Sequence, residues 1–154
     1  IMNLQKTVLF ALLILFSTLI CNAQTTGKTS IILVKNSEQV IKSTPAYGEL
    51  ILQKTEVIAE LADLVVEFTE EYPKVVELRT QLALINKEIS RLMTVNPAEA
   101  SKLSPALGKL MLRKVEIEMD YEKLQKKYTD DHPDVKQAKR KVDLFEAAIK
   151  DILQ

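Results

Sequence analysis

The residue types that build most enzymatic sites are scarce in this chain of 154 residues. It has one cysteine, one histidine, three glycines and no tryptophan. Glycine-rich phosphate loops, nucleophile elbows and cysteine–histidine zinc sites need several such residues at fixed spacings, and no such motif occurs. We therefore expect no catalytic, cofactor-binding or metal-binding residue, no enzymatic activity and no small-molecule substrate.

An excess of charge of one sign is also absent. Twenty-one basic residues balance 21 acidic ones. The densest basic cluster is interrupted by acidic residues, which is typical of a solvated helix face and argues against nucleic-acid binding. The cluster comprises Lys136, Lys139, Arg140 and Lys141, with Asp134 and Asp143 among them.

Long hydrophobic runs are limited to one segment near the start. The uncharged run Val8–Ile20 follows Lys6, and it is shorter than the roughly 20 residues that span a bilayer. Cys21 and Ala23 then provide small residues at the −3 and −1 positions of a cleavage site. Residues 1–23 are therefore predicted to be a secretory signal peptide cleaved near Ala23. The mature chain would be periplasmic or secreted, without a membrane span. Lipoprotein processing at Cys21 is the alternative, disfavoured by the bulky Ile20 before it.

An ungapped internal repeat is the strongest signal that the sequence does contain. Residues 44–94 align with residues 104–154, an offset of 60 positions (104 − 44). Pro45, Gly48 and Lys54 recur as Pro105, Gly108 and Lys114, among other identities. A unit repeated in this way usually buries its apolar face against its neighbour.

Each repeat is predicted to be an antiparallel helical hairpin. Apolar residues recur at intervals of three and four, which places them on one helix face. Thr44-Pro45 and Ser104-Pro105 are helix-start signals, and Pro73 and Pro133 each end one helix and begin the next. We predict an all-α fold, either a four-helix bundle or a coiled-coil array. Its parts are a mostly irregular segment (24–43), in which Ser37–Lys42 could be helical, hairpin 1 (44–95), a connector (96–103) and hairpin 2 (104–154).

The two hairpins differ in one additional stripe of residues. It is apolar in hairpin 1 and largely polar in hairpin 2, so we expect hairpin 2 to cover it and hairpin 1 to be the more enclosed. The stripe consists of Ile51, Ile58 and Val65 in hairpin 1 and of Met111, Glu118 and Gln125 in hairpin 2.

Lys54 and Lys114 occupy equivalent apolar seam positions. Each is expected to extend its ammonium group to solvent from a buried stem, although a seam lysine can also specify register. Glu88 should lie opposite Lys54, with Ala148 as its counterpart in hairpin 2. The repeated glycines, Gly48 and Gly108, suggest a close helix approach or a loosened first turn.

The turns carry the remaining candidate residues. His132, which replaces Tyr72 of the first repeat, is expected to pack its ring over the turn; a metal ligand or a pH sensor is the alternative. The carboxylate pairs Glu70-Glu71 and Asp130-Asp131 lack a pocket that would separate two pKa values, so acid–base catalysis is not expected there.

The second turn also resembles a known pattern. Leu124-x3-Tyr128-x3-His132-Pro133-Asp134-Val135, echoed from Leu64 to Val75, is similar to the coiled-coil hairpin of bacterial polysaccharide chain-length regulators and exopolysaccharide export proteins. The resemblance covers about 30 residues of each repeat and implies two antiparallel helices in the periplasm. Unlike those proteins, the chain has no second membrane helix and no kinase domain.

These features predict an exported, non-enzymatic helical interaction module of the bacterial envelope, with a link to polysaccharide export suggested by the resemblance alone. It would bind a protein partner, or itself, through helical faces. A periplasmic holdase chaperone is the alternative, because exported helical arms can also hold unfolded clients.

Overall fold

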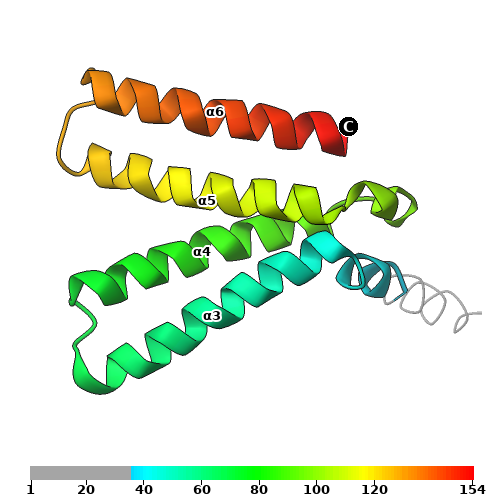
Figure 1. Ribbon diagram of the computed structural model, residues 1–154, viewed down its shortest axis with the longest axis horizontal. Coiled ribbons are helices and arrows are strands. Elements are labelled where there is room, and N and C mark those ends of the chain that lie inside the picture. Colours follow the sequence, from blue (N-terminus) through cyan, green and yellow to red (C-terminus); the bar gives the residue numbers. More distant parts are fainter. Residues whose placement is uncertain (1–35) are drawn as a thin grey trace, which may run out of the picture. The chain divides into compact units, whose positions relative to one another are not determined.

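The computed structural model describes residues 36–154, so the predicted signal peptide, residues 1–23, lies outside the described residues. After a helical segment that ends at residue 42, four α-helices follow in order: α3 (Pro45–Glu67), α4 (Pro73–Met93), α5 (Pro105–Gln125) and α6 (Pro133–Leu153). A short 3-10 helix, η1 (Pro97–Lys102), joins α4 to α5 (Figure 1). The described residues contain no strand, and the all-α prediction is confirmed.

Residues 36–42 are helical, which agrees with the possibility of a helix at Ser37–Lys42 within a segment predicted to be mostly irregular. Residues 24–35 lie outside the described range. Ile41 is 1% exposed and joins a core that includes Leu50, Leu92 and Leu107. One buried apolar side chain therefore anchors this short helical segment to the hairpins.

The hairpin limits follow the predicted start signals. The hydroxyl groups of Thr44 and Ser104 accept hydrogen bonds from Tyr47 N and Leu107 N, at 3.4 and 3.3 Å. Each satisfies one of the backbone N–H groups that the first turn of a helix leaves without a partner. Since proline stands at the first position of α3 and α5, the two repeats begin with the same local structure.

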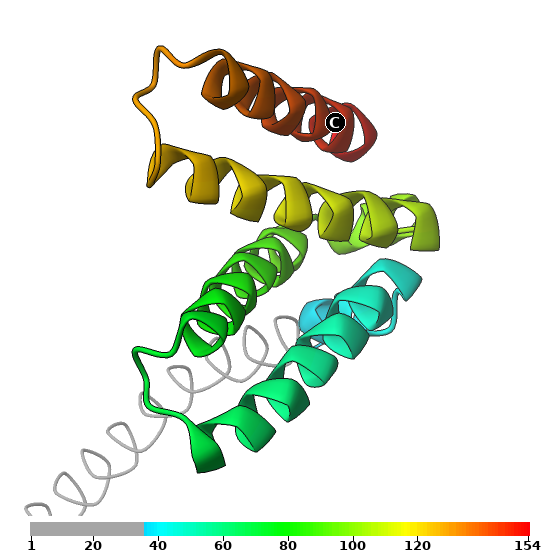
Figure 2. The same cartoon turned by 60° about the vertical axis from the view of Figure 1, so that its left-hand side comes forward.

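The helices form an open stack of two hairpins. α3 packs against α4, and α5 packs against α6, as predicted. α5 also contacts both α3 and α4, whereas α6 packs mainly against α5. Figure 2 shows α5 between α6 and hairpin 1. Of the two predicted architectures, the array describes this arrangement better than a closed four-helix bundle does, because α6 does not cover hairpin 1.

Two clusters of buried side chains hold the stack together. One lies near the starts of α3 and α5 and the end of α6, and joins Leu50, Leu107 and Ile149. The other joins α3 and α4 to Val115 and Met119 of α5. Burial of apolar surface at these clusters is the main favourable term for such helices, since isolated helices of this length are marginal in water.

The additional apolar stripe of hairpin 1 is not covered. Ile58 is 44% exposed and Val65 is 41% exposed, while Met111 of hairpin 2 is fully buried. The expectation that hairpin 2 encloses this stripe is therefore wrong. The repeats stack through the opposite side of α3, and α5 is the helix with neighbours on two sides.

Candidate protein-interaction site

The junction between the repeats depends on a glycine. A Cβ atom added to Gly108 would lie 2.9 Å from the Cβ of Glu49 and 3.0 Å from the Cα of Ala46. Ala46 is fully buried here, and its N–H donates a hydrogen bond of 3.2 Å to the carbonyl oxygen of Leu103. The missing side chain thus lets α5 approach the backbone of α3.

Gly48, the repeat equivalent of Gly108, has no neighbour of this kind. A Cβ atom placed on it would meet nothing within 4 Å. The predicted close approach is therefore confirmed at Gly108 and wrong at Gly48. Ala106, the equivalent of Ala46, is exposed. The repeat equivalents of both junction residues, Gly48 and Ala106, therefore lie on exposed surfaces.

A buried ion pair connects the hairpins next to this junction. Lys114 Nζ lies 2.7 Å from Glu88 Oε1, and the two side chains are 4% and 2% exposed. Lys114 Nζ also lies 2.9 Å from Glu146 Oε2 and 3.5 Å from Glu118 Oε2. Helices α4, α5 and α6 thereby share one cation.

Two further cations complete the network, which holds three positive and three negative side chains. Arg91 lies 2.9 Å from Glu146 and 3.9 Å from Glu88, and Lys87 lies 2.8 Å from Glu118. Such a balance is required of a partly buried cluster, because an uncompensated charge away from water is costly.

The network favours the charged forms of Lys114 and Glu146. Burial disfavours charge on Lys114, but hydrogen bonds to Glu88 and Glu146 and attraction by the carboxylates raise its pKa above the ordinary 10.5. Burial likewise opposes charge on Glu146, yet Lys114 and Arg91 lower its pKa below the ordinary 4.5. Both shifts move away from neutral pH, so these groups are suited to holding helices together and poorly suited to transferring protons.

The structure changes the interpretation of both seam lysines. Lys114 does not extend to solvent; the predicted side-chain placement is wrong for it. Glu88 pairs with Lys114 rather than with Lys54, which has no ion pair or hydrogen bond among residues 36–154. Sequence reasoning identified both charges but matched Glu88 to the wrong repeat. The role of Glu146 was not predicted from the sequence. Its counterpart in the first repeat is the neutral Asn86, so the repeat gives no signal at this position.

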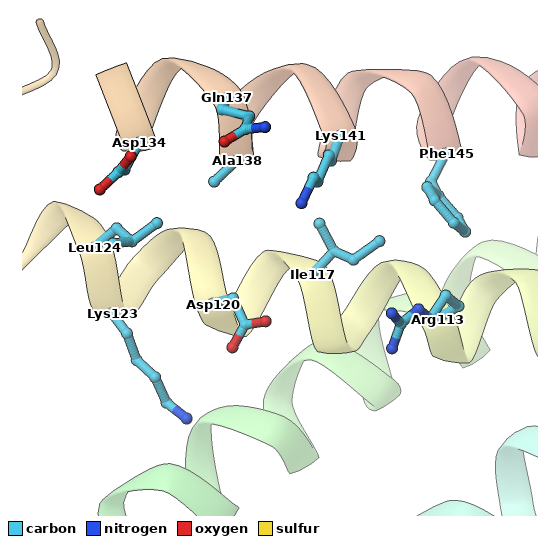
Figure 3. Close-up of a pocket in the computed structure, with 10 residues that line it drawn as sticks. All are labelled: Arg113, Ile117, Asp120, Lys123, Leu124, Asp134, Gln137, Ala138, Lys141 and Phe145. Atoms are coloured by element: carbon cyan, nitrogen blue, oxygen red, sulfur yellow. The ribbon is translucent and has the colours of Figure 1, made fainter. Parts of the chain in front are cut away.

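A hollow among the described residues lies between α5 and α6. This α5–α6 groove has a volume of about 710 Å³. Figure 3 shows Ile117 and Leu124 on α5 beneath Ala138, Lys141 and Phe145 on α6. Its apolar floor and charged rim are typical of a surface that binds protein. The full lining is Arg113, Ile117, Asp120, Lys123, Leu124, Asp134, Gln137, Ala138, Lys141 and Phe145.

A second apolar surface runs along the outer side of α3. Four of its side chains are well exposed: Leu52 (59%), Ile58 (44%), Val65 (41%) and Val66 (84%). Together with Gly48 they form what we call the outer α3 face. Single exposed apolar residues are ordinary, but four of them on the solvent-exposed part of one helix favour an interaction surface.

The turns behave as packing elements. His132 caps α6 by accepting a 3.2 Å hydrogen bond from Asp134 N, and its ring stacks on Tyr128 at 4.1 Å. Tyr72 stacks on Phe68 at the same distance. The predicted ring packing over the turn is confirmed for His132, and Tyr72 packs in the same way in the first repeat.

The charged candidates near the turns lie on the surface. Glu70 accepts a 2.6 Å hydrogen bond from Arg79 Nε, which lowers the pKa of Glu70 below its ordinary value. Asp131 pairs with Lys136 at 2.9 Å. The basic cluster Lys136, Lys139, Arg140 and Lys141 is exposed, which agrees with the predicted solvated helix face.

Within residues 36–154, no group of three or more histidine, cysteine, aspartate or glutamate side chains could hold a metal ion. None of the helices in this range is long and apolar enough to cross a membrane. Comparison of the chain with known protein families, curated proteins and solved structures finds no match.

Proposed function

We propose that this protein is a non-enzymatic helical interaction module, exported to the bacterial envelope, that binds protein through the outer α3 face and the α5–α6 groove. The observation that carries the proposal is a pair of apolar surfaces outside the two buried clusters: the exposed side chains of the outer α3 face and the apolar floor of the α5–α6 groove. Burying such surfaces would supply the driving force for association.

The scaffold supports this role by fixing the two surfaces. The buried Lys114–Glu88 pair and its neighbours connect α4, α5 and α6. Partners that bind rigid surfaces lose less conformational freedom on association than those that bind flexible ones. Export rests on the segment Lys6–Ala23, and a link with polysaccharide export rests on the turn from Leu124 to Val135.

Site-specific photo-crosslinking in cells tests the proposal. A photoreactive residue at position 66, in the outer α3 face, should give defined protein adducts, and position 56 on the same helix serves as the exposed control. Defined adducts from position 66 alone support the module. Equal, diffuse labelling from both positions would overturn it.

The holdase alternative predicts a different outcome. A chaperone should suppress aggregation of an unfolded outer-membrane protein at near-equal molar amounts, and Val66→Glu should abolish this suppression. An interaction module should leave that aggregation unchanged while still giving defined adducts in cells.

A further inference from the structure

The repeat relates the two apolar surfaces to the junction inside the chain. α5 contacts hairpin 1 through Gly108, Leu112, Val115 and Met119. Subtracting the offset of 60 gives Gly48, Leu52, Thr55 and Ala59, which lie along the outer side of α3. Gly48 and Leu52 of the outer α3 face are therefore the first-repeat equivalents of residues that the second repeat packs against hairpin 1. Ile58, Val65 and Val66 correspond instead to Glu118, Gln125 and Lys126, none of which is buried.

The α5–α6 groove is in turn the second-repeat equivalent of the surface of hairpin 1 that contacts α5. Ile117, Ala138 and Phe145 line the α5–α6 groove, and they correspond to Val57, Leu78 and Ile85 of hairpin 1. Those three residues belong to the core cluster that Val115 and Met119 of α5 complete. Leu144 is 69% exposed on α6, whereas its equivalent Leu84 is 8% exposed.

We infer that a second copy of this chain occupies the groove, with the outer α3 face of one copy docked between α5 and α6 of the next. The rotation and translation that relate hairpin 1 to hairpin 2 within one chain would also relate hairpin 2 of one copy to hairpin 1 of the next. This partner assignment rests on the proposed function and names the protein that the two surfaces bind. Because the two contacting surfaces differ, each copy keeps one free, and assembly proceeds head to tail.

Backbone groups at the junction are available for the same contact. Inside the chain Ala46 donates its N–H to Leu103 O. In the assembly the exposed Ala106 would meet Gly48 of the next copy, with its N–H directed to the carbonyl of Ser43, the equivalent of Leu103. The absent Cβ of Gly48 leaves room for that approach.

Charge adds modest complementarity. Hairpin 1 with its connector, residues 44–103, carries six basic and ten acidic residues, a net charge of −4. Hairpin 2, residues 104–154, carries eleven basic and ten acidic residues, a net charge of +1. Contact of one copy's hairpin 1 with the other's hairpin 2 is thus weakly favourable.

One pair of the internal junction is missing between copies. Lys54 would take the place of Lys114, but Ala148 stands where Glu88 would be needed. The association between copies should therefore be weaker than the internal junction. This difference allows a gain-of-affinity variant, Ala148→Glu, which restores the buried pair across the interface.

Sedimentation velocity over a concentration series of the purified protein tests the inference. The wild type should shift reversibly to larger species. Leu52→Glu and Leu144→Glu, both at exposed positions, should each lower the association constant by about tenfold or more, with unchanged circular dichroism melting at low concentration.

Mixing those two variants identifies the geometry. Leu52→Glu retains an intact groove and Leu144→Glu retains an intact outer α3 face, so the mixture should form heterodimers and nothing larger. Ala148→Glu should raise the association constant above that of the wild type. A wild type that stays monomeric, or a Leu144→Glu variant that self-associates as the wild type does, would overturn the head-to-tail inference.

The photo-crosslinking experiment separates this inference from the proposed function. Defined adducts to a different protein, with a monomeric wild type, would leave the interaction module standing and refute self-association. Adducts to a second copy would support both.

Discussion

Helices α3 and α5 hold equivalent positions of one repeat, yet their surroundings differ. α5 buries Gly108, Met111 and Lys114, whereas the outer side of α3 leaves Gly48 without neighbours and Leu52 exposed. Similar local sequence gives both the same helix and the same N-terminal cap. The number of neighbours, rather than the helix itself, decides what an equivalent residue contributes to stability.

The two seam lysines provide the strongest test of this comparison. Lys114→Met would leave Glu88 buried without its main partner, and we expect a loss of about 3–5 kcal/mol in the free energy of unfolding. Lys54→Met should change that free energy by no more than about 0.5 kcal/mol, because Lys54 has no charged partner in the monomer. Urea unfolding monitored by circular dichroism measures both.

A double variant serves as the control for the lysine test. Lys114→Met combined with Glu88→Leu removes both buried charges and should recover most of the lost stability. Equal losses for the Lys54 and Lys114 variants would contradict the difference between the repeats.

The groove residues give the next largest difference. Ile85 is fully buried, so Ile85→Ala should cost about 2–5 kcal/mol. Its equivalent Phe145 is only partly buried, and Phe145→Ala should cost about 1 kcal/mol in dilute solution. Thermal melts at several protein concentrations check this, and the Phe145 loss should grow with concentration if a second copy covers the groove.

The glycine pair should respond with opposite signs. Gly108→Ala forces a methyl group against the Ala46 backbone and should cost about 1 kcal/mol net, since overpacking exceeds the gain in helix propensity. Gly48→Ala meets no obstacle and should stabilise the monomer by about 0.5 kcal/mol. Chemical denaturation at protein concentrations too low for self-association compares the two variants. A destabilising Gly48→Ala would contradict the open space beside α3.

The smallest expected effect is on pH dependence. The pKa of Glu146 is lowered in the folded chain, so its stabilising contribution is present above the ordinary pKa of 4.5 and lost as the pH falls below it. The pKa of Lys114 is raised, so its contribution persists beyond pH 10.5 and is lost only at still higher pH. Glu146→Gln should reduce the loss of unfolding free energy at acid pH, whereas changing the equivalent Asn86 to Ala should not. Unfolding curves measured between pH 3 and 6 test both expectations.

Local signals were sufficient to predict the helices. Proline after Thr44, Tyr72, Ser104 and His132 marks each helix start, and the apolar spacing gives each helix a packing face. The turn packing of His132 followed from the aromatic residue at the equivalent position. These features depend on neighbours close in sequence, so one sequence contains enough information to predict them.

The contacts between repeats could not be predicted in the same way. An ungapped repeat shows that two units are alike but not which faces they share. Ile58 and Val65 were expected to be covered because they are apolar, and they face outward instead. Glu88 was assigned to Lys54 within its hairpin, since nothing local shows that α4 also lies beside α5. The candidate site became visible only when the internal junction fixed which sides of α3 and α5 are equivalent.

The single main neighbour of α6 has a consequence for the order in which the molecule opens. Detaching α6 breaks its packing on α5, removes Ile149 from the first core cluster and breaks the contacts through Glu146. It leaves α3, α4 and α5 joined by the Gly108 approach and the Glu88–Lys114 pair. Amide hydrogens of α6 should therefore exchange with solvent through a partial opening that spares α5. A neighbour seated in the groove would close that route, so slower exchange along α6 would report the occupancy of the groove from within the chain.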